Sequence, residues 1–240
     1  MKKKTAILIV AFFLLCLIAA LISLALARPV RQTQTFNPVT KLVTDSFKPS
    51  QLDSIERVFS HAELLPEYRD VILTVLAYYP DLKDVNIRFI YGSEMTTMAS
   101  RPDIKSALLG KRAYNILIND DSEFEGILLS DVPREAQIGV IAHELAHAVQ
   151  YESYNYLGII QLGLMYLDEE SKSIFERETD ERTISRGFGK YLKAWAQYSM
   201  HDSPKATQEY KEFKQRIYMS PQEIEAEMEK YSCYSATDSL

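Results

Sequence analysis

The feature that most constrains the fold of this chain is the segment 138–150, in which His143, Glu144 and His147 form the spacing H-E-x-x-H. Apolar residues recur through this segment at the spacing of one helix face, at Ile138, Ile141, Leu145 and Val149, which predicts a helix. Residues four positions apart stand on the same face of a helix, so His143 and His147 can hold one metal ion together. Glu144 lies about 100° further round the helix. From there its carboxylate can reach a water molecule on that ion without being a ligand.

The surroundings of the motif favour a functional helix over two core histidines with ordinary hydrogen-bond partners. Small residues keep the helix slim, so that other elements can approach it closely; they are Ala142, Ala146 and Ala148. Ser130 and Asp131 followed by Pro133 are typical of a helix start. We therefore expect a metal site on a closely packed helix that begins near Pro133.

Composition and charge bound the class of protein. A chain of 240 residues with 47% hydrophobic and 25% charged residues is typical of one globular domain, alone or with an appendage. The net charge is −6, and residues 1–27 contain three lysines and no acid, so the remainder carries −9. This balance argues against nucleic acid as a partner. The two cysteines, Cys16 and Cys233, are not expected to meet, which leaves His, Asp and Glu as metal ligands.

The N-terminus predicts export. Three lysines at positions 2–4 precede an apolar run over 6–27 that only Ser23 interrupts, and this length spans a bilayer as a helix. The same run also fits a signal peptide with Ala25-Leu26-Ala27 as its cleavage site. The run is longer than a usual signal core, so we expect a retained single-pass anchor with a cytoplasmic N-terminus and an exported domain. Cleavage after residue 27 would instead give a secreted or periplasmic protein.

Two regions follow the apolar run. Residues 28–50 are rich in threonine, glutamine and proline and lack periodicity, which predicts a flexible linker. Residues 51–240 are expected to form the folded domain. Before the motif, the patterns predict helices over about 50–65 and 66–79, strands over 85–91 and 112–119, and an irregular segment over 92–110 with a short helix at 104–109.

After the motif helix only further helices are predicted, over about 154–167, 171–186, 191–200, 204–218 and 221–231. The segment 154–167 is apolar nearly all round but too short to span a membrane, so a core helix is expected, with contact to a membrane surface as a secondary possibility. The last helix opens with Ser220-Pro221-Gln222-Glu223, a capping box with proline at the first helical position. Strands before the motif and helices after it predict an α+β, helix-dominated fold.

A catalytic zinc takes three protein ligands and keeps one position for water, so a third ligand must come from another element. Gln150 and Ser153 stand where a longer motif would place one. The acidic segment 175–182 is the candidate, because helical geometry puts Glu176 and Asp180 on one face. Glu176 would bind the ion, and Asp180 would orient a ligand histidine. Three other carboxylates remain open as the third ligand, namely Glu178 and the weaker candidates Glu223 and Glu225; a plain solvated helix is the alternative to all of them.

These two motifs together resemble the gluzincin metallopeptidases, which include the thermolysin-like enzymes and the membrane-associated prenyl-protein and heat-shock proteases. His143-Glu144-Leu145-Ala146-His147 matches the first motif in full. Glu176-Arg177-Glu178-Thr179-Asp180 matches the second at both defining positions, with Thr179 where the membrane proteases usually have alanine. The resemblance covers these two helices, and the chain lacks further membrane helices and a large C-terminal domain. It does not define a subfamily.

The resemblance implies the zincin fold, in which a small N-terminal sheet lies over the active-site helix and its edge strand binds peptide. The segment 112–119 is in the right place in the sequence for that strand and would pair with an extended substrate. In this group a histidine or a tyrosine from the C-terminal half stabilises the oxyanion. The candidates here are His201, Tyr191 and Tyr218, although a helix-capping role is the commoner explanation for His201.

The leading hypothesis is therefore an exported, membrane-anchored endopeptidase with one Zn²⁺ per chain, held by His143, His147 and Glu176. Glu144 would take the proton of the attacking water, and the partners would be a peptide or protein substrate and the membrane at the N-terminal helix. The second hypothesis is a binding or scaffold protein on a zincin frame, without catalysis. A non-peptidase hydrolase with the same zinc centre is a third. An open groove beside Glu144 would favour catalysis.

Overall fold

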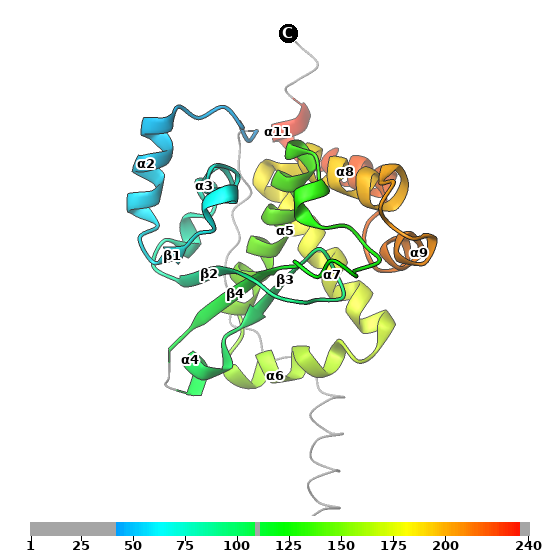
Figure 1. Cartoon of the computed structure of the whole chain (residues 1–240), viewed down its shortest axis with the longest axis horizontal. Coiled ribbons are helices and arrows are strands. Elements are labelled where there is room, and N and C mark those ends of the chain that lie inside the picture. Colours follow the sequence, from blue (N-terminus) through cyan, green and yellow to red (C-terminus); the bar gives the residue numbers. More distant parts are fainter. Residues whose placement is uncertain (1–41, 109–110, 236–240) are drawn as a thin grey trace, which may run out of the picture.

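The computed structural model describes residues 42–108 and 111–235. The expected membrane segment 1–27, with Cys16, and the linker up to residue 41 lie outside these residues. Within the described ranges, none of the helices has the length and apolar character needed to cross a membrane. The described part has an α+β, helix-dominated fold with a small sheet on the N-terminal side of the sequence (Figure 1). This confirms the α+β, helix-dominated class, while the zincin frame stays a prediction.

Residues just before the first described helix pack against the rest of the domain. Val43 is buried, and the backbone N–H of Thr44 donates a hydrogen bond of 2.8 Å to the hydroxyl of Tyr78. The end of the segment expected as linker therefore contacts the folded part, which among the described residues already includes Val43, before the expected start at residue 51.

In the described residues, the α-helices and strands before the motif helix are α2 (Pro49–Val58), β1 (Ala62–Glu63), α3 (Arg69–Leu76), β2 (Asn86–Tyr91), β3 (Met98–Pro102), α4 (Ile104–Leu108) and β4 (Ala113–Ile118). The predicted strands over 85–91 and 112–119 correspond to β2 and β4. The first helix ends at Val58 instead of continuing to about residue 65, because the chain turns there into β1. The strand β3 lies in the segment expected to be irregular.

The four strands pair in the order β1-β2-β4-β3, with β1, β2 and β4 parallel and β3 antiparallel to β4. The prediction that 112–119 forms the edge strand beside the site is wrong, because β4 is paired on both sides. The edge is β3, in which Ser100 lies opposite Ile116. β3 was missed because its sequence, Met98 to Pro102, lacks the alternation of a half-buried strand and ends in proline.

The motif helix α5 (Arg134–Glu152) is the centre of the domain. It is buried along most of its length and contacts α3, β3, α7 and α8. The hydroxyl of Tyr79 donates a hydrogen bond of 2.6 Å to the carbonyl of Ala142. Gly139 is the point of closest approach to α8 (Gly189–Gln197), since a Cβ at this position would lie 2.1 Å from the carbonyl oxygen of Tyr191. Neighbours on several sides thus fix the position of α5.

Helix α6 (Tyr156–Met165) follows α5 and lies along the lower edge of the molecule in Figure 1. The prediction of a core helix over 154–167 is wrong, because the buried residues within α6 are restricted to Gly158, Gln161 and Leu162. Its other side carries exposed apolar residues. Because α6 is apolar nearly all round, its sequence does not indicate which side the rest of the domain covers. In the structure the domain covers one side of α6.

The C-terminal part consists of α7 (Glu169–Thr183), α8, α9 (Gln208–Ile217), α10 (Pro221–Met228) and α11 (Ser232–Ser235). A π-helical turn at Ile184–Phe188 joins α7 to α8, and Gly187 in this turn has a φ of 90°, which favours glycine. A second π-helical turn, Tyr198–Asp202, ends α8. The capping box predicted at Ser220 is present at the start of α10. The predicted run of helices after the motif is confirmed.

Candidate metal centre

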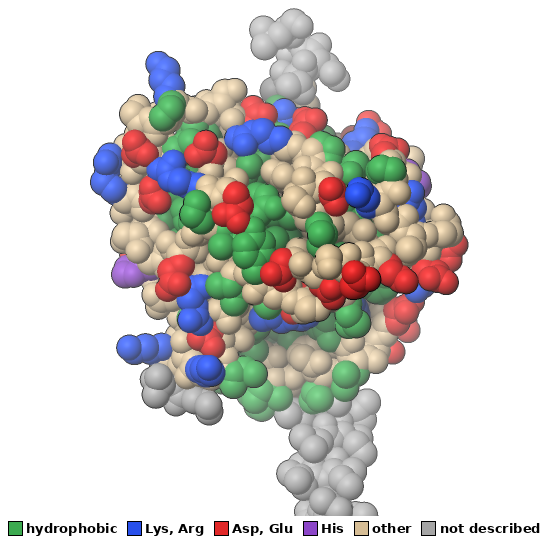
Figure 2. Space-filling view, in the orientation of Figure 1, with side chains coloured by type: hydrophobic (Ala, Val, Ile, Leu, Met, Phe, Trp, Pro, Cys, Tyr) green, Lys and Arg blue, Asp and Glu red, His purple; other side chains and the backbone are tan. Residues whose placement is uncertain are grey.

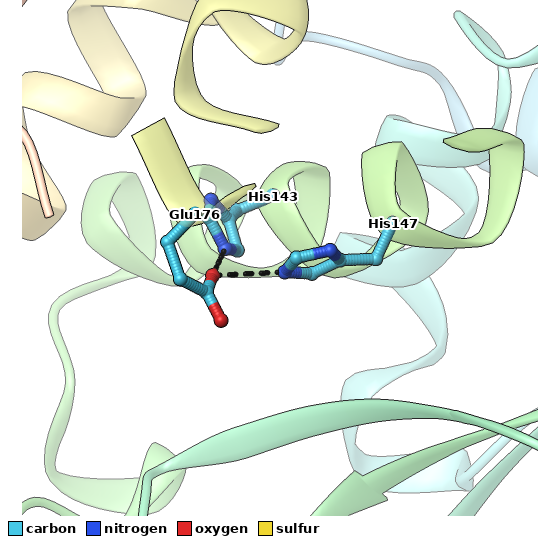
Figure 3. A group of neighbouring side chains, drawn as sticks. All are labelled: His143, His147 and Glu176. Atoms are coloured by element: carbon cyan, nitrogen blue, oxygen red, sulfur yellow. Dashed lines mark hydrogen bonds and ion pairs between the residues drawn. The ribbon is translucent and has the colours of Figure 1, made fainter. Parts of the chain in front are cut away.

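Three side chains from α5 and α7 converge in the interior. The Nε2 atoms of His143 and His147 each lie 3.0 Å from the same oxygen, Oε2 of Glu176 (Figure 3). All three residues are buried, and their potential ligand atoms lie within 4.8 Å of one another. The spacing of four residues on α5 and the packing of α7 against it bring these atoms together.

This group could hold a metal ion. Two donor atoms that each lie about 2.1 Å from a tetrahedral ion stand about 3.4 Å apart, so an ion would need the observed separations to widen by a few tenths of an ångström. The other candidate carboxylates are engaged elsewhere. Glu178 lies 3.9 Å from Arg182, Glu223 caps α10, and Glu225 pairs with Lys193 at 2.9 Å.

The second nitrogen of each histidine has a partner that fixes the ring. Nδ1 of His143 lies 2.8 Å from Oδ1 of Asp180, whose Oδ2 accepts the backbone N–H of Met219 at 3.0 Å. Nδ1 of His147 lies 3.2 Å from Oγ1 of Thr179, which in turn donates to Gln150 at 2.8 Å. Both rings are therefore oriented with Nδ1–H as donor, and each Nε2 faces Glu176 and is available as a ligand atom.

The protonation states of His143 and Glu176 depend on each other and on their neighbours. Burial opposes the protonated form of His143, but the hydrogen bonds to Asp180 and Glu176 outweigh it and raise its pKa to about 10. Burial would raise the pKa of Glu176, but the charge of His147 and the hydrogen bonds from both histidines hold it well below its usual range. In the metal-free protein a proton on His143 thus occupies the place that a cation would take.

Tyr166, immediately after α6, also contacts the cluster, since its hydroxyl donates a hydrogen bond of 2.8 Å to Oε1 of Glu176. Burial raises the pKa of Tyr166 well above its ordinary value, so the hydroxyl keeps its proton. The two oxygens of Glu176 therefore have different partners. No sequence pattern indicates this contact, because it depends on where the fold places the end of α6.

Glu144 is buried and turned toward the edge of the sheet. Its Oε2 accepts a hydrogen bond of 2.6 Å from the backbone N–H of Ser100 on β3. The carbonyl of Ser100 accepts a bond of 3.3 Å from the hydroxyl of Tyr151. Since both backbone groups of Ser100 bond to α5, they point away from β4, along the free edge of the sheet. The sequence could not indicate this contact, because β3 itself was not predicted.

A cavity of about 190 Å³ lies beside Glu144, and His147 and Glu176 also line it. Its walls come from the segment leading into β3, from β3 itself and from the helical part; they include Glu94, Met98, Ser100, Arg101, Tyr166, Lys172 and Tyr218. Glu144 and two members of the cluster, His147 and Glu176, therefore border one space.

The structure brings one of the three oxyanion candidates to this cavity. Tyr218 lines it, and its ring stands edge-on to His143 with a centroid distance of 5.6 Å. The Nζ of Lys214 lies 3.5 Å from the centre of the Tyr218 ring. Burial raises the pKa of Tyr218 well above its ordinary value, so its hydroxyl is a donor. Tyr191, buried on α8 beside Phe188, and the exposed His201 are not among the residues that line the cavity.

Comparisons with protein-family models, with curated proteins and with solved structures find no match to this chain. The family resemblance therefore rests on the two sequence motifs. The functional argument rests on the geometry of the cluster and of the cavity beside it.

Proposed function

We propose that this protein is a zinc-dependent endopeptidase of the gluzincin kind, with one zinc ion per chain. The observation that carries the proposal is the convergence of two imidazole nitrogens on one carboxylate oxygen, beside a cavity that a further carboxylate, Glu144, also borders. The same proposal includes the zincin frame, export of the domain, and a membrane anchor formed by residues 1–27.

The donor set favours zinc in a catalytic rather than a structural site. Two histidines and one glutamate provide three ligands, and catalytic zinc sites keep their fourth position open, whereas structural sites are closed by a fourth protein ligand. The group in the described residues has three members, His143, His147 and Glu176. When bound, zinc supplies Lewis acidity and lowers the pKa of a water molecule.

The residues around the cavity have distinct roles in this proposal. Glu144 takes the proton of the attacking water and later passes it to the leaving amine. The hydroxyl of Tyr218 donates a hydrogen bond to the carbonyl oxygen as negative charge develops on it. Asp180 holds the ring of His143 in place. Burial raises the pKa of Tyr218 well above its ordinary value and keeps the phenol neutral, as a donor must be.

The free edge of β3 supports peptide as the substrate class. The backbone groups of Ser100 point along this edge, and the alternation of an antiparallel strand places those of Met98 on the same side. An extended peptide that pairs with such an edge aligns its backbone beside the cavity. Binding in this way requires Glu144 and Tyr151 to release the backbone N–H and carbonyl of Ser100, and Thr96 to release the carbonyl of Met98.

The non-catalytic scaffold remains the second candidate, and two contacts favour it. The carboxylate of Glu144 is bonded to the Ser100 amide, and that of Glu176 is bonded to the Tyr166 hydroxyl. Both bonds restrain groups that catalysis must use. A protein that binds zinc and partners without turnover would keep them in place.

The experiment compares the full chain with Glu144→Gln, Glu176→Gln and the matched control Glu178→Gln, all purified in detergent. We expect one zinc per chain by elemental analysis in the wild type, in Glu144→Gln and in the control. Cleavage of a mixed peptide library should be lost in Glu144→Gln, while zinc should be lost in Glu176→Gln and not in the control. Full cleavage by Glu144→Gln would exclude this mechanism, and zinc without any cleavage in the wild type would favour the scaffold.

A further inference from the structure

Helix α6 presents an apolar face to the outside of the molecule. Its exposed and half-buried apolar residues recur at helical spacing, and Leu167 and Ile104 of α4 extend the surface; the α6 face consists of Ile104, Tyr156, Leu157, Ile160, Leu164 and Leu167. The inner side carries the buried polar residue Gln161. A surface helix of a globular protein turns its apolar stripe inward. Here the outer side of α6 is apolar in addition to the inner side, where Leu162 is buried. This indicates that the outer side has an apolar partner.

A groove adds to this surface. A cavity of about 310 Å³ opens between the start of α4, the start of β4 and the outer side of α6, and most of its lining is apolar; Ile104, Ala113, Tyr114, Tyr156, Ile159 and Ile160 are part of it. Ile104, Tyr156 and Ile160 belong both to the α6 face and to the lining of this groove. Figure 2 shows hydrophobic side chains at the lower edge of the molecule.

The charges around the α6 face are basic on the side of α4. Lys105 and Lys111 are exposed there, and neither forms an ion pair with another described residue. Figure 2 shows basic side chains beside the apolar ones at the lower left. Helix α6 itself contains no charged residue, and acidic side chains start beyond Leu167, at Asp168. An apolar helix bordered by lysines matches the boundary between the acyl chains and the anionic headgroups of a bilayer.

We propose that the α6 face lies on the surface of a lipid bilayer, with α6 parallel to the membrane plane. The apolar run over 6–27 would hold the chain at the membrane, in keeping with the proposed anchor. The 14 residues from 28 to 41 extend to at most roughly 50 Å, so they keep the domain within reach of that surface. The contact does not require peptidase activity. This contact orients the domain relative to the membrane. Because Tyr166 follows α6 directly and contacts Glu176, the contact also determines how the metal cluster lies relative to the membrane.

The test measures the immersion of the α6 face in the full chain, reconstituted in vesicles of phosphatidylcholine with or without anionic phosphatidylglycerol. A nitroxide is attached at Ile160→Cys, in a chain that carries Cys16→Ala and Cys233→Ala. The matched control is Val58→Cys on α2, since Val58 is 59% exposed and Ile160 is 55% exposed. We expect the label at 160 to gain collisions with oxygen and to lose collisions with a water-soluble nickel complex, relative to the label at 58. Anionic lipid should strengthen this difference.

Two outcomes would overturn the proposal. Equal nickel access at positions 160 and 58 would mean that the α6 face is in water. Loss of collisions with both reagents at 160 would mean that protein covers the face, either a second copy or another segment of this chain. A second label at Leu157→Cys, which is 47% exposed, repeats the test if the first perturbs the fold. In Lys105→Glu/Lys111→Glu the effect of anionic lipid should disappear, and its persistence would contradict the role given to these lysines.

Discussion

Asp180 provides a direct test of how the metal centre is supported. Its carboxylate accepts two hydrogen bonds in the interior, from Nδ1 of His143 at 2.8 Å and from the backbone N–H of Met219 at 3.0 Å. In Asp180→Asn one carboxylate oxygen becomes an amide nitrogen, so one of the two donors loses its acceptor. The change leaves the three ligand side chains in place and removes the charge that orients one of them.

Two separate effects are expected. A buried donor without an acceptor costs about 1–3 kcal/mol, so the metal-free variant should lose that much free energy of unfolding. Loss of an oriented ligand typically lowers metal affinity about 10–100-fold, and each factor of ten is about 1.4 kcal/mol. The zinc-bound variant should therefore be destabilised by the sum of both effects, relative to the zinc-bound wild type.

The two effects are measured independently. Denaturant unfolding of the metal-free chain gives the first, and competition for zinc with a chromophoric chelator gives the second. The control is Glu181→Gln, an equal loss of charge on the exposed side of the same helix, which should change neither. Unaltered zinc affinity in Asp180→Asn, together with the expected loss of stability, would show that Asp180 supports the fold alone and would refute its role as a positioning residue.

Three further predictions concern pH, catalysis and the backbone. The pKa of His143 rises from 6.5 to about 10 on folding. Its contribution to the free energy of unfolding is therefore complete below pH 6.5 and is lost as the pH rises through 10. The pKa of Glu176 falls below 4.5, so the contribution of Glu176 is present above pH 4.5. Thermal unfolding of the metal-free chain should therefore show decreasing stability between pH 6.5 and 10, with a smaller decrease in His143→Gln. Tyr218→Phe should lower kcat on peptide roughly 100-fold, as loss of an oxyanion donor does, with unchanged zinc content. Gly187→Ala should cost about 1–3 kcal/mol in denaturant unfolding, because alanine is strained at a φ of 90°.

Each of these predictions has a clear contrary result. An identical pH dependence in wild type and His143→Gln would mean that other groups determine it. Full kcat in Tyr218→Phe would remove the tyrosine from catalysis. Wild-type stability in Gly187→Ala would mean that the turn between α7 and α8 tolerates a side chain.

Local geometry explains what the sequence could predict about the site. His143 and His147 share a face because they are four residues apart on one helix, and this holds in any fold that keeps the helix. The same rule placed Glu176 and Asp180 together on α7. The need for a third ligand predicts that α7 packs beside α5. The structure confirms this, since Glu176 lies next to His143 and His147.

The features that the sequence did not predict depend on packing between distant segments. β3 is a strand because β4 pairs with it, although Met98 to Pro102 carries no alternation of its own. Tyr166 contacts Glu176 because of where α6 ends. The apolar sequence of α6 suited a core helix, and burial on one side is a property of the assembled domain.

The close approach at Gly139 limits how this protein can diverge. A Cβ there would meet the backbone of Tyr191 rather than a flexible side chain, so a compensating change of side chain elsewhere would not make room for it. Any descendant that keeps the packing of α5 on α8 must then keep a hydrogen atom as the side chain four residues before His143. The sequence motif shared by relatives with this packing is therefore nine positions long, Gly-x-x-x-His-Glu-x-x-His, instead of the five positions of H-E-x-x-H. Chains with the bare histidine motif but a larger residue at that point must pack the helix differently.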